Sequence, residues 1–433
     1  MYIERNEYIE KLNRRKWNGR VKVIAGLRRS GKSFLLFELF KKQLISEGVN
    51  ESNIISLALD SLDNTALTDP YVLYDYIKDK ITDKSEAYYV FLDEIQYTIS
   101  PEELRQKDIP PRIYGVLNGL LQMKNVDVYV TGSNSKLLSE DIMTEFRGRG
   151  DVVSVFPLSF KEFLPASGKN KEEAFNDYML YGGLPLVLSY STMEEKAAYL
   201  ESLFSEIYLK DIVERYRITK PEVLSNLVNV VCSQTGSLTN ISKITDTVNS
   251  MMRNKKDERI AHATISSYFK YLMDSFLFSE AKRYDIRGKS YFDGISKYYP
   301  TDTGLRNARL NFRQIEETHL MENIIFNYLK SSGFRVDVGV IVKNRTDKDG
   351  KHIRVPYEID FVVNKGMYQY YIQSAFRMET AEKMERELYP FSITGNSFKK
   401  IVVTRHELLP HYDENGIFHV GITDFLLGDY LRE

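Results

Sequence analysis

The sequence predicts an α/β protein that opens with a mainly parallel sheet covered by helices on both faces. Short apolar runs alternate with helical patterns over residues 1–160, which is the order of strand and return helix in such a sheet. The expected strands cover residues 21–25, 54–59, 88–92, 126–131 and 152–155. The chain has 433 residues, enough for roughly two to four domains that each bury a core.

A phosphate-binding loop follows the first expected strand. Residues 26–33 read GLRRSGKS and fit the pattern G-x-x-x-x-G-K-[ST], and a helix is expected from Lys32 onward. Free backbone amides at a helix start can hold a phosphate, Lys32 offers a charge to the β and γ groups, and the Ser33 hydroxyl can bind magnesium. This order predicts the P-loop NTPase fold, with ATP and Mg²⁺ bound by Gly26, Leu27, Arg28, Arg29, Ser30, Gly31, Lys32 and Ser33. The alternative is a turn that matches the pattern by chance.

Two adjacent carboxylates end the apolar run 88–92. Such a run suits a buried strand that neighbours the loop strand in a parallel sheet. We expect Asp93 to hold Mg²⁺ through water and Glu94 to polarise the attacking water. Adjacent carboxylates at a strand end can also be ordinary surface residues. The loop upstream favours the catalytic interpretation.

Small polar residues end the strand that begins at Val126. In ATPases of this build, a polar side chain at that point reports on the γ-phosphate. Ser133 and Asn134 are the candidates, with Asn134 preferred. Residues 132–134 can equally form a simple turn, and their spacing does not decide between the two.

Composition and charge exclude several classes of protein. The net charge is −1, so no global field attracts nucleic acid or membrane, and any nucleic-acid surface must be local. The single cysteine, Cys232, excludes an intramolecular disulfide and a cysteine-based metal cluster, which points to a reducing compartment. The N-terminus is charged, and no run approaches the roughly 18 apolar residues that span a bilayer. We therefore expect a cytoplasmic protein without membrane contact.

The remaining chain divides into three further expected domains. Residues 161–220 form helical patterns broken at 181–185, typical of a lid. Residues 221–310 give three helices followed by two strands, the order of a winged helix. Residues 311–433 open with a helix and continue through several strands.

The motifs of this chain resemble those of a large prokaryotic family of AAA+-like P-loop ATPases whose C-terminal domain is uncharacterised. The resemblance rests on residues 26–33, 92–96, 131–138, 148–149, 157–163, 181–185 and 297–305. It spans most of the chain in the family's order. It implies an ATP-dependent machine or switch and gives no cellular role.

An arginine after the polar strand carries a further expectation from this resemblance. Similar ATPases place an arginine there, where it reaches the γ-phosphate of a neighbouring subunit. Arg149, after Gly148, fits that pattern better than Arg147. If Arg149 acts on a neighbour, the active form is a homo-oligomer. The alternative is an exposed loop arginine.

A basic hairpin is the candidate for contact with double-stranded DNA. Residues 264–272 form an expected helix with polar side chains on one side, where a recognition helix would lie. The strands that follow carry a basic cluster, and basic residues can hold phosphates: Lys282, Arg283, Arg287 and Lys289. Winged helices also bind proteins, and a basic hairpin can simply be a solvated edge.

The last domain resembles a restriction-endonuclease-like core. Glu322 lies in its first expected helix and Asp360 in the expected strand 358–363. In that core the next strand carries a glutamate and a lysine, but here Gln373 and Ala375 occupy those positions. Because a metal-binding carboxylate and an amine are both missing, we expect a nuclease-like fold without nuclease activity.

Two functions of different class follow. One is an ATPase that couples hydrolysis to a DNA-bound or protein assembly. The other is a slow nucleotide-dependent switch or scaffold that binds a protein partner without DNA. The intact Glu94 favours hydrolysis.

Overall fold

The computed structural model describes two compact units of the chain. Its described residues are 2–100, 102–103, 109–133, 150–252, 259–346, 352–376, 380–395, 398–406 and 408–431. The N-terminal unit comprises Met1–Pro157 with Asp274–Phe276, and the C-terminal unit comprises Leu158–Met273 with Leu277–Glu433. The division into four domains at 160, 220 and 310 stays a prediction. Among the described residues, no helix is both long enough and apolar enough to cross a membrane.

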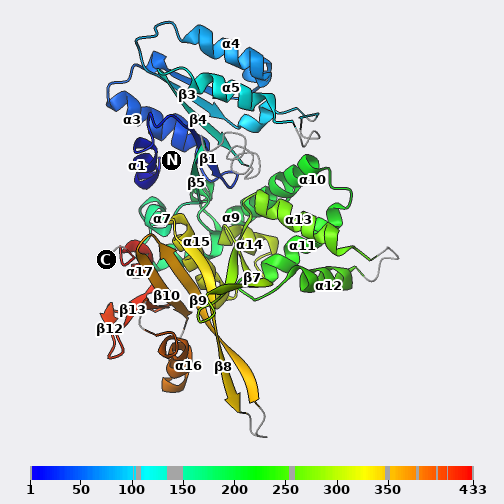
Figure 1. Ribbon diagram of the computed structural model, residues 1–433, viewed down its shortest axis with the longest axis vertical. Helices are drawn as coiled ribbons and strands as arrows, with labels where there is room; N and C mark the ends of the chain where they lie inside the picture. The colour runs from blue at the N-terminus through cyan, green and yellow to red at the C-terminus, as the bar shows by residue number, and fades with distance from the viewer. Residues whose placement is uncertain are drawn as a thin grey trace. The chain divides into compact units, whose positions relative to one another are not determined.

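The N-terminal unit is built on a parallel sheet, as predicted (Figure 1). Its strands among the described residues are β1 (Val21–Gly26), β2 (Ile54–Ala58), β3 (Tyr88–Asp93), β4 (Val126–Gly132) and β5 (Gly150–Val155). Their order across the sheet is β2-β3-β4-β1-β5, and every pair is parallel. The strand that ends at Asp93 is therefore not the neighbour of the loop strand. That prediction is wrong because β4 lies between them.

Helices cover both faces of this sheet. They are α1 (Asn6–Asn13), α4 (Pro70–Lys80), α5 (Arg112–Leu121) and a continuous helical run made of α2 (Lys32–Phe34), η1 (Leu35–Phe40) and α3 (Lys41–Ser46). Successive strand residues point to opposite faces. Val23 packs with α4 and α5, and Ile24 packs with α1 and the 32–46 run. The near-continuous apolar runs in the sequence reflect this burial on both faces.

A buried ion pair closes the end of the sheet where β1 and β4 begin. The Lys22 ammonium donates to Asp127, and the Tyr129 hydroxyl donates to the other Asp127 oxygen at 2.8 Å. The backbone N–H of Trp17 also donates to Asp127, at 3.1 Å, and its indole N–H donates to the Tyr89 hydroxyl at 3.0 Å. Asp127 thus has several donors in place of water, which a buried carboxylate requires.

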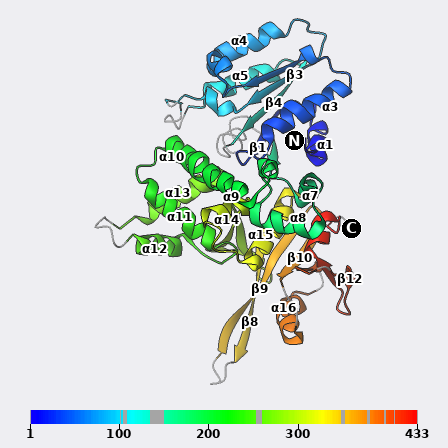
Figure 2. The same cartoon turned by 180° about the vertical axis from the view of Figure 1, so that it is seen from behind.

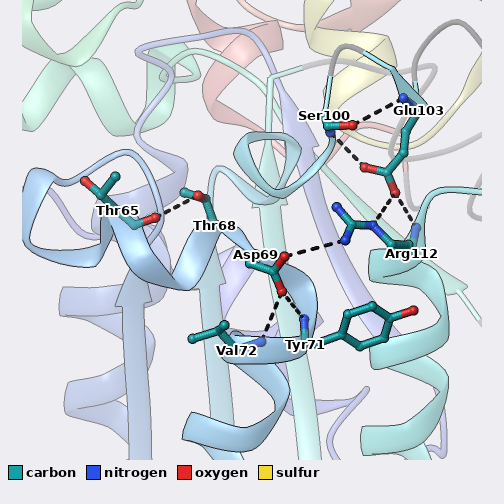
Figure 3. Close-up of polar contacts among 8 residues, drawn as sticks. All are labelled: Thr65, Thr68, Asp69, Tyr71, Val72, Ser100, Glu103 and Arg112. Atoms are coloured by element: carbon teal, nitrogen blue, oxygen red, sulfur yellow. Dashed lines mark hydrogen bonds and ion pairs between the residues drawn. The ribbon is translucent and has the colours of Figure 1, made fainter.

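The chain between β3 and α5 is fastened to α4 by a second polar network (Figure 3). Glu103 accepts hydrogen bonds from the backbone N–H of Arg112 at 2.8 Å and from that of Ser100 at 2.8 Å. The Arg112 guanidinium reaches Asp69 at 3.5 Å. Asp69 caps α4 by accepting from the backbone N–H of Tyr71 at 2.9 Å. The connection that follows Asp93 and Glu94 is held at its far end by this network.

Helices open the C-terminal unit. They are α7 (Phe160–Ser167), α8 (Lys171–Tyr181), α9 (Met193–Ser202), η8 (Leu203–Leu209), α10 (Lys210–Tyr216), α11 (Pro221–Ser233), α12 (Ile241–Met251), α13 (His262–Asp274) and α14 (Thr303–Arg309). Ser159 and Glu162 form a capping box at the start of α7. Helix α8 ends before Gly182, whose φ is 73° and whose added Cβ would lie 2.1 Å from Asp302 Oδ1. Only glycine fits this turn.

A mixed sheet completes the C-terminal unit. Among the described residues its strands are β6 (Phe278–Asp285), β7 (Ser290–Pro300), β8 (Arg335–Thr346), β9 (His352–Lys365), β10 (Tyr368–Ala375), β11 (Lys399–Thr404), β12 (His411–Tyr412) and β13 (Ile417–Gly421). Their order is β12-β13-β11-β10-β9-β8-β6-β7. Helices α15 (Glu317–Ser331), α16 (Ala381–Ser392) and α17 (Ile422–Leu427) accompany it. Figure 2 shows β8 and β9 continuing past the other strands as a two-stranded ribbon.

The β6–β7 hairpin belongs to this same sheet. Strand β6 pairs with β7 on one side and with β8 on the other, where Arg283, Tyr284 and Asp285 lie opposite residues 338–340. The basic hairpin that the sequence places in a winged helix therefore shares hydrogen bonds with the strands of the expected C-terminal domain.

Candidate nucleotide-binding site

The loop between β1 and α2 has the backbone that the glycine pattern predicts. A Cβ added to Gly26 would lie 2.0 Å from the Val155 carbonyl oxygen, so a side chain there would separate β1 from β5. Gly31 has φ 92° and precedes the helix start at Lys32. The non-glycine residue Arg29 also has a positive φ, of 64°. The loop is thus a tight backbone cradle at a helix N-terminus, which suits phosphate.

Lys32 lies folded over this cradle. Its ammonium donates to the carbonyl oxygens of Gly26 at 3.2 Å and of Leu27 at 3.0 Å, and its side chain is buried. Burial lowers the pKa of Lys32, while the nearby carboxylates of Glu94 and Asp93 act in the opposite direction. A phosphate oxygen can replace the two carbonyl acceptors and satisfy the same ammonium.

The two predicted magnesium ligands lie together. Burial raises the pKa of Asp93, and side-chain hydrogen bonds with Thr131 and Ser33 oppose that rise. Asp93 comes from the end of β3, and Ser33 comes from the first turn after the loop. A carboxylate beside a hydroxyl, next to a cradle for phosphate, is an oxygen donor set that fits Mg²⁺.

Thr131, for which no role was predicted, connects the Asp93 carboxylate to the backbone of Glu94. Its hydroxyl donates to Asp93 and accepts from the backbone N–H of Glu94 at 3.0 Å. Glu94 has a positive φ of 52°, and one of its carboxylate oxygens accepts from the Gln96 amide. Its role depends on strand register, which the sequence does not show: Leu92 pairs with Val130, and the next residues therefore lie side by side.

The other residues of the loop differ in exposure. Leu27 and Ser30 are buried, Arg28 is half-buried and Arg29 is exposed. The Ser30 carbonyl accepts from Arg5 at 3.0 Å. Arg5 was also missed in the sequence, since nothing in its N-terminal position links it to the loop.

Arg5 joins the loop to the end of the N-terminal unit. It is buried, and its guanidinium donates to the carbonyl oxygens of Phe156 at 3.0 Å and Pro157 at 3.4 Å, in addition to Ser30. Its carbon Cζ lies 4.4 Å from the centre of the Tyr8 ring. A change in the loop backbone therefore has a direct hydrogen-bonded route to the segment after β5.

Of the remaining predicted residues of this site, the structure describes only Ser133. Ser133 is buried at the end of β4. Asn134 and Arg149 lie outside the described residues, so both stay predictions.

The residues of the expected nuclease-like site do converge. The backbone N–H of Asp360 donates to Gln373 Oε1 at 3.3 Å, and Asp360 Oδ2 accepts from the backbone N–H of Ser374 at 2.8 Å. Glu322 reaches the same place from α15. Ala375 is buried in the core of the sheet.

Lys297, for which no role in this site was predicted, also reaches the cluster. The Lys297 ammonium, from β7, lies 2.8 Å from Glu322 Oε1, 2.8 Å from Glu358 Oε1 and 3.9 Å from Asp360 Oδ1. Burial alone would lower the pKa of Lys297, but the three carboxylates outweigh it and raise the pKa. Within the described ranges, no group of three or more His, Cys, Asp or Glu side chains is arranged to hold a metal ion.

The basic hairpin presents most of its predicted residues to solvent. Lys282, Arg287 and Lys289 are exposed. Arg283 is half-buried, with its guanidinium 4.7 Å from the centre of the Phe292 ring. The hairpin turn contains Lys289 with a positive φ of 51°.

Comparison with known proteins places the phosphate loop in a family. Residues 18–164 match the model described as the AAA domain, and this range includes the loop, Asp93, Glu94 and Thr131. A protein of Haemophilus influenzae, described as uncharacterized, is 32% identical over 436 residues, with 98% of each chain covered. The chain belongs to this family of P-loop ATPases.

Further matches extend beyond the AAA domain. Residues 172–316 match a model described as a domain of unknown function (DUF8612). A Methanocaldococcus jannaschii protein, also described as uncharacterized, is 25% identical, with 85% of this chain and 77% of that protein covered. The Aeropyrum pernix ORC2 protein, solved in ADPNP-ADP complexes, aligns with a TM-score of 0.37 and 12% identity over 72% of this chain and 93% of that chain.

Proposed function

We propose that this P-loop ATPase binds and hydrolyses ATP with Mg²⁺ and couples its nucleotide state to a DNA-bound or protein assembly. One observation carries the proposal. The Thr131 hydroxyl ties Asp93 to the backbone of Glu94, beside the buried ammonium of Lys32. The carboxylate proposed to hold the metal and the backbone of the residue proposed to orient water are thus linked next to a phosphate cradle.

Each residue of the site has a proposed role. The backbone of residues 26–33 and the Lys32 ammonium hold the phosphates, Ser33 and Asp93 hold the metal, and Glu94 orients the attacking water. When bound, Mg²⁺ neutralises charge on the phosphate oxygens. Asn134 reads the γ-phosphate, and Arg149 reaches it from a neighbouring subunit in a homo-oligomer.

The C-terminal unit is the part of the chain that we propose to contact the DNA-bound or protein assembly. Helices α7 to α10 serve as a lid, and α11, α12 and α13 with the β6–β7 hairpin serve as a winged helix. The order α15-β8-β9-β10-α16-β11, with antiparallel pairs followed by a parallel pair, supports a restriction-endonuclease-like core. Gln373 and Ala375 support the absence of nuclease activity.

The test compares phosphate release with DNA binding. Purified full-length chain is assayed for phosphate release from ATP with and without double-stranded DNA, beside a gel-shift titration over salt concentration. Stimulation by DNA, together with binding that weakens at high salt, supports the DNA-coupled ATPase. Slow release that DNA does not change, with no gel shift, would instead favour the nucleotide-dependent switch that binds a protein partner.

A further inference from the structure

The acidic cluster around Lys297 brings together three separate elements. Lys297 and Tyr299 lie two residues apart in β7 and so point to the same face. Glu358 and Asp360 have the same spacing in β9, and Glu322 comes from α15. The Tyr299 ring stacks on Phe326 at 4.2 Å, one helical turn after Glu322, which places the two β7 side chains over that helix.

The lysine lies at the centre of the cluster. Glu322 Oε1 accepts from the Lys297 ammonium at 2.8 Å and from the Tyr299 hydroxyl at 2.6 Å. The side-chain exposures of Lys297, Glu322 and Asp360 are 5%, 10% and 12%, whereas that of Glu358 is 34%. Of these four side chains, Glu358 is the most exposed to solvent.

These contacts suit an ammonium better than a divalent metal. Charge-assisted N–H···O bonds have lengths of about 2.7–2.9 Å, and two carboxylate oxygens lie at 2.8 Å from Nζ. Mg²⁺ requires oxygens at about 2.0–2.1 Å. A metal placed among the same oxygens would face the buried positive charge of Lys297 at close range, which is costly in a site that excludes water.

We propose that the ammonium of Lys297 is the permanent cation of this cluster, that it takes the place of a divalent metal ion, and that it fastens β7 to α15 and β9. The inference deepens the proposed absence of nuclease activity and rests on that part of the proposed function. It does not depend on ATP hydrolysis.

The test is a Mn²⁺ titration of the full-length chain without nucleotide, followed by electron paramagnetic resonance of free Mn²⁺. Lys297→Met keeps the side-chain stem and removes the ammonium, so it should bind one more Mn²⁺ than the wild type. The double variant Lys297→Met with Glu322→Gln should lose that additional site. Asp360→Asn in the wild-type background should leave Mn²⁺ binding unchanged.

Two results of the titration would overturn the inference. One is Mn²⁺ bound to the wild type and lost in Asp360→Asn. The other is a folded Lys297→Met chain with no additional site. If Lys297→Met is too unstable for the titration, thermal unfolding of the two variants decides, because removing both charges should restore part of the Tm that Lys297→Met loses. A double variant no more stable than Lys297→Met would exclude the fastening role.

A plasmid assay separates this inference from the proposed function. Metal-dependent nicking by the wild type that disappears in Asp360→Asn would contradict the proposed absence of nuclease activity. Mn²⁺ binding through Asp360 without nicking would contradict only the role of Lys297.

Discussion

Single residues account for most of the proposed chemistry. Lys32, Ser33, Asp93 and Glu94 could be identified from short motifs, because each lies next to an apolar run that marks its strand or helix. The roles of Thr131, Arg5 and Lys297 could not be predicted in this way. Each is defined by a contact with residues far away in the sequence, and those contacts depend on strand order and register.

Lys32 and Glu94 should give different defects. Lys32→Ala removes charge from the phosphates and should abolish ATP binding. Glu94→Gln should keep binding and lower phosphate release by roughly 100-fold or more, since it removes the group that orients water. Nucleotide binding by fluorescent ATP analogue and phosphate release check the two. Equal loss of nucleotide affinity in both variants would contradict the assigned roles.

A variant of Thr131 tests the hydrogen bonds that link Asp93 to the backbone of Glu94. Thr131→Val keeps the shape but removes the hydroxyl that bonds Asp93 and the backbone of Glu94. We expect turnover to fall by about 10- to 100-fold, the range for loss of a partner that orients a metal ligand, while ATP binding without metal is kept. Thr131→Ser is the matched control and should retain most activity. Normal turnover in Thr131→Val would argue against the bridge.

At the scale of elements, Asp302 shows how one buried group joins two segments. It caps α14 by accepting from the backbone N–H of Leu305 at 3.0 Å, and it accepts from the backbone N–H of Gly183 at 2.8 Å. Burial raises the pKa of Asp302 to about 6, although backbone hydrogen bonds oppose the rise. The folded carboxyl therefore holds its proton at a pH where the unfolded one has lost it.

The stability should depend on pH in a defined direction. Between about pH 4 and pH 6 the folded chain binds more protons at Asp302 than the unfolded chain, so the contribution of Asp302 to stability falls as pH rises through this window. At about 1.4 kcal/mol per pKa unit, the total change is about 3 kcal/mol. Urea unfolding at several pH values checks this.

A pair of variants isolates Asp302 from other titrating groups. Asp302→Asn should make the decline between pH 4 and pH 6 smaller by the share that Asp302 contributes. Asp177 is the control because Lys169 and Lys196, at 2.7 Å and 2.9 Å, outweigh burial and lower its pKa. Asp177→Asn should therefore leave the decline in place. A wild-type profile that rises over this window and is unchanged in Asp302→Asn would refute the assignment.

The basic hairpin is a second element whose role can be tested. Replacing Lys282, Arg283, Arg287 and Lys289 together should weaken any DNA binding and flatten its dependence on salt, because each lost phosphate contact removes a released counterion. Gel-shift titrations over salt measure this. Replacing the exposed Lys78 and Lys80 of α4 should leave the slope unchanged. An equal effect from both sets would indicate non-specific attraction.

The positions of most strands along the chain could be predicted, but the strands that pair with each other in the sheets could not. Apolar runs located all of β1 to β5 within a few residues. The sequence carries no sign that β4 lies between β1 and β3, because any of the buried strands satisfies the same apolar pattern. Similarly, β6 and β7 could be predicted as a pair, but the pairing of β6 with β8 joins segments more than 50 residues apart in the chain.

For the whole molecule, a mixing experiment tests the proposed homo-oligomer. If Arg149 acts on a neighbouring subunit, mixing Arg149→Ala chains with Glu94→Gln chains should recover part of the phosphate release. A mixed interface then pairs an intact Glu94 with an intact arginine. Activity that does not depend on protein concentration, with no recovery on mixing, would favour a monomeric switch.

The position of Trp17 gives the molecule an intrinsic optical probe. The chain has one tryptophan, and its indole N–H is bonded to Tyr89 where the strands of the N-terminal unit begin. Its emission will therefore follow the melting of that unit alone, whatever happens in the C-terminal unit. Circular dichroism reports on both. When the protein is heated with and without nucleotide, comparing the two signals would thus reveal, without any label, which of the two units the nucleotide stabilises.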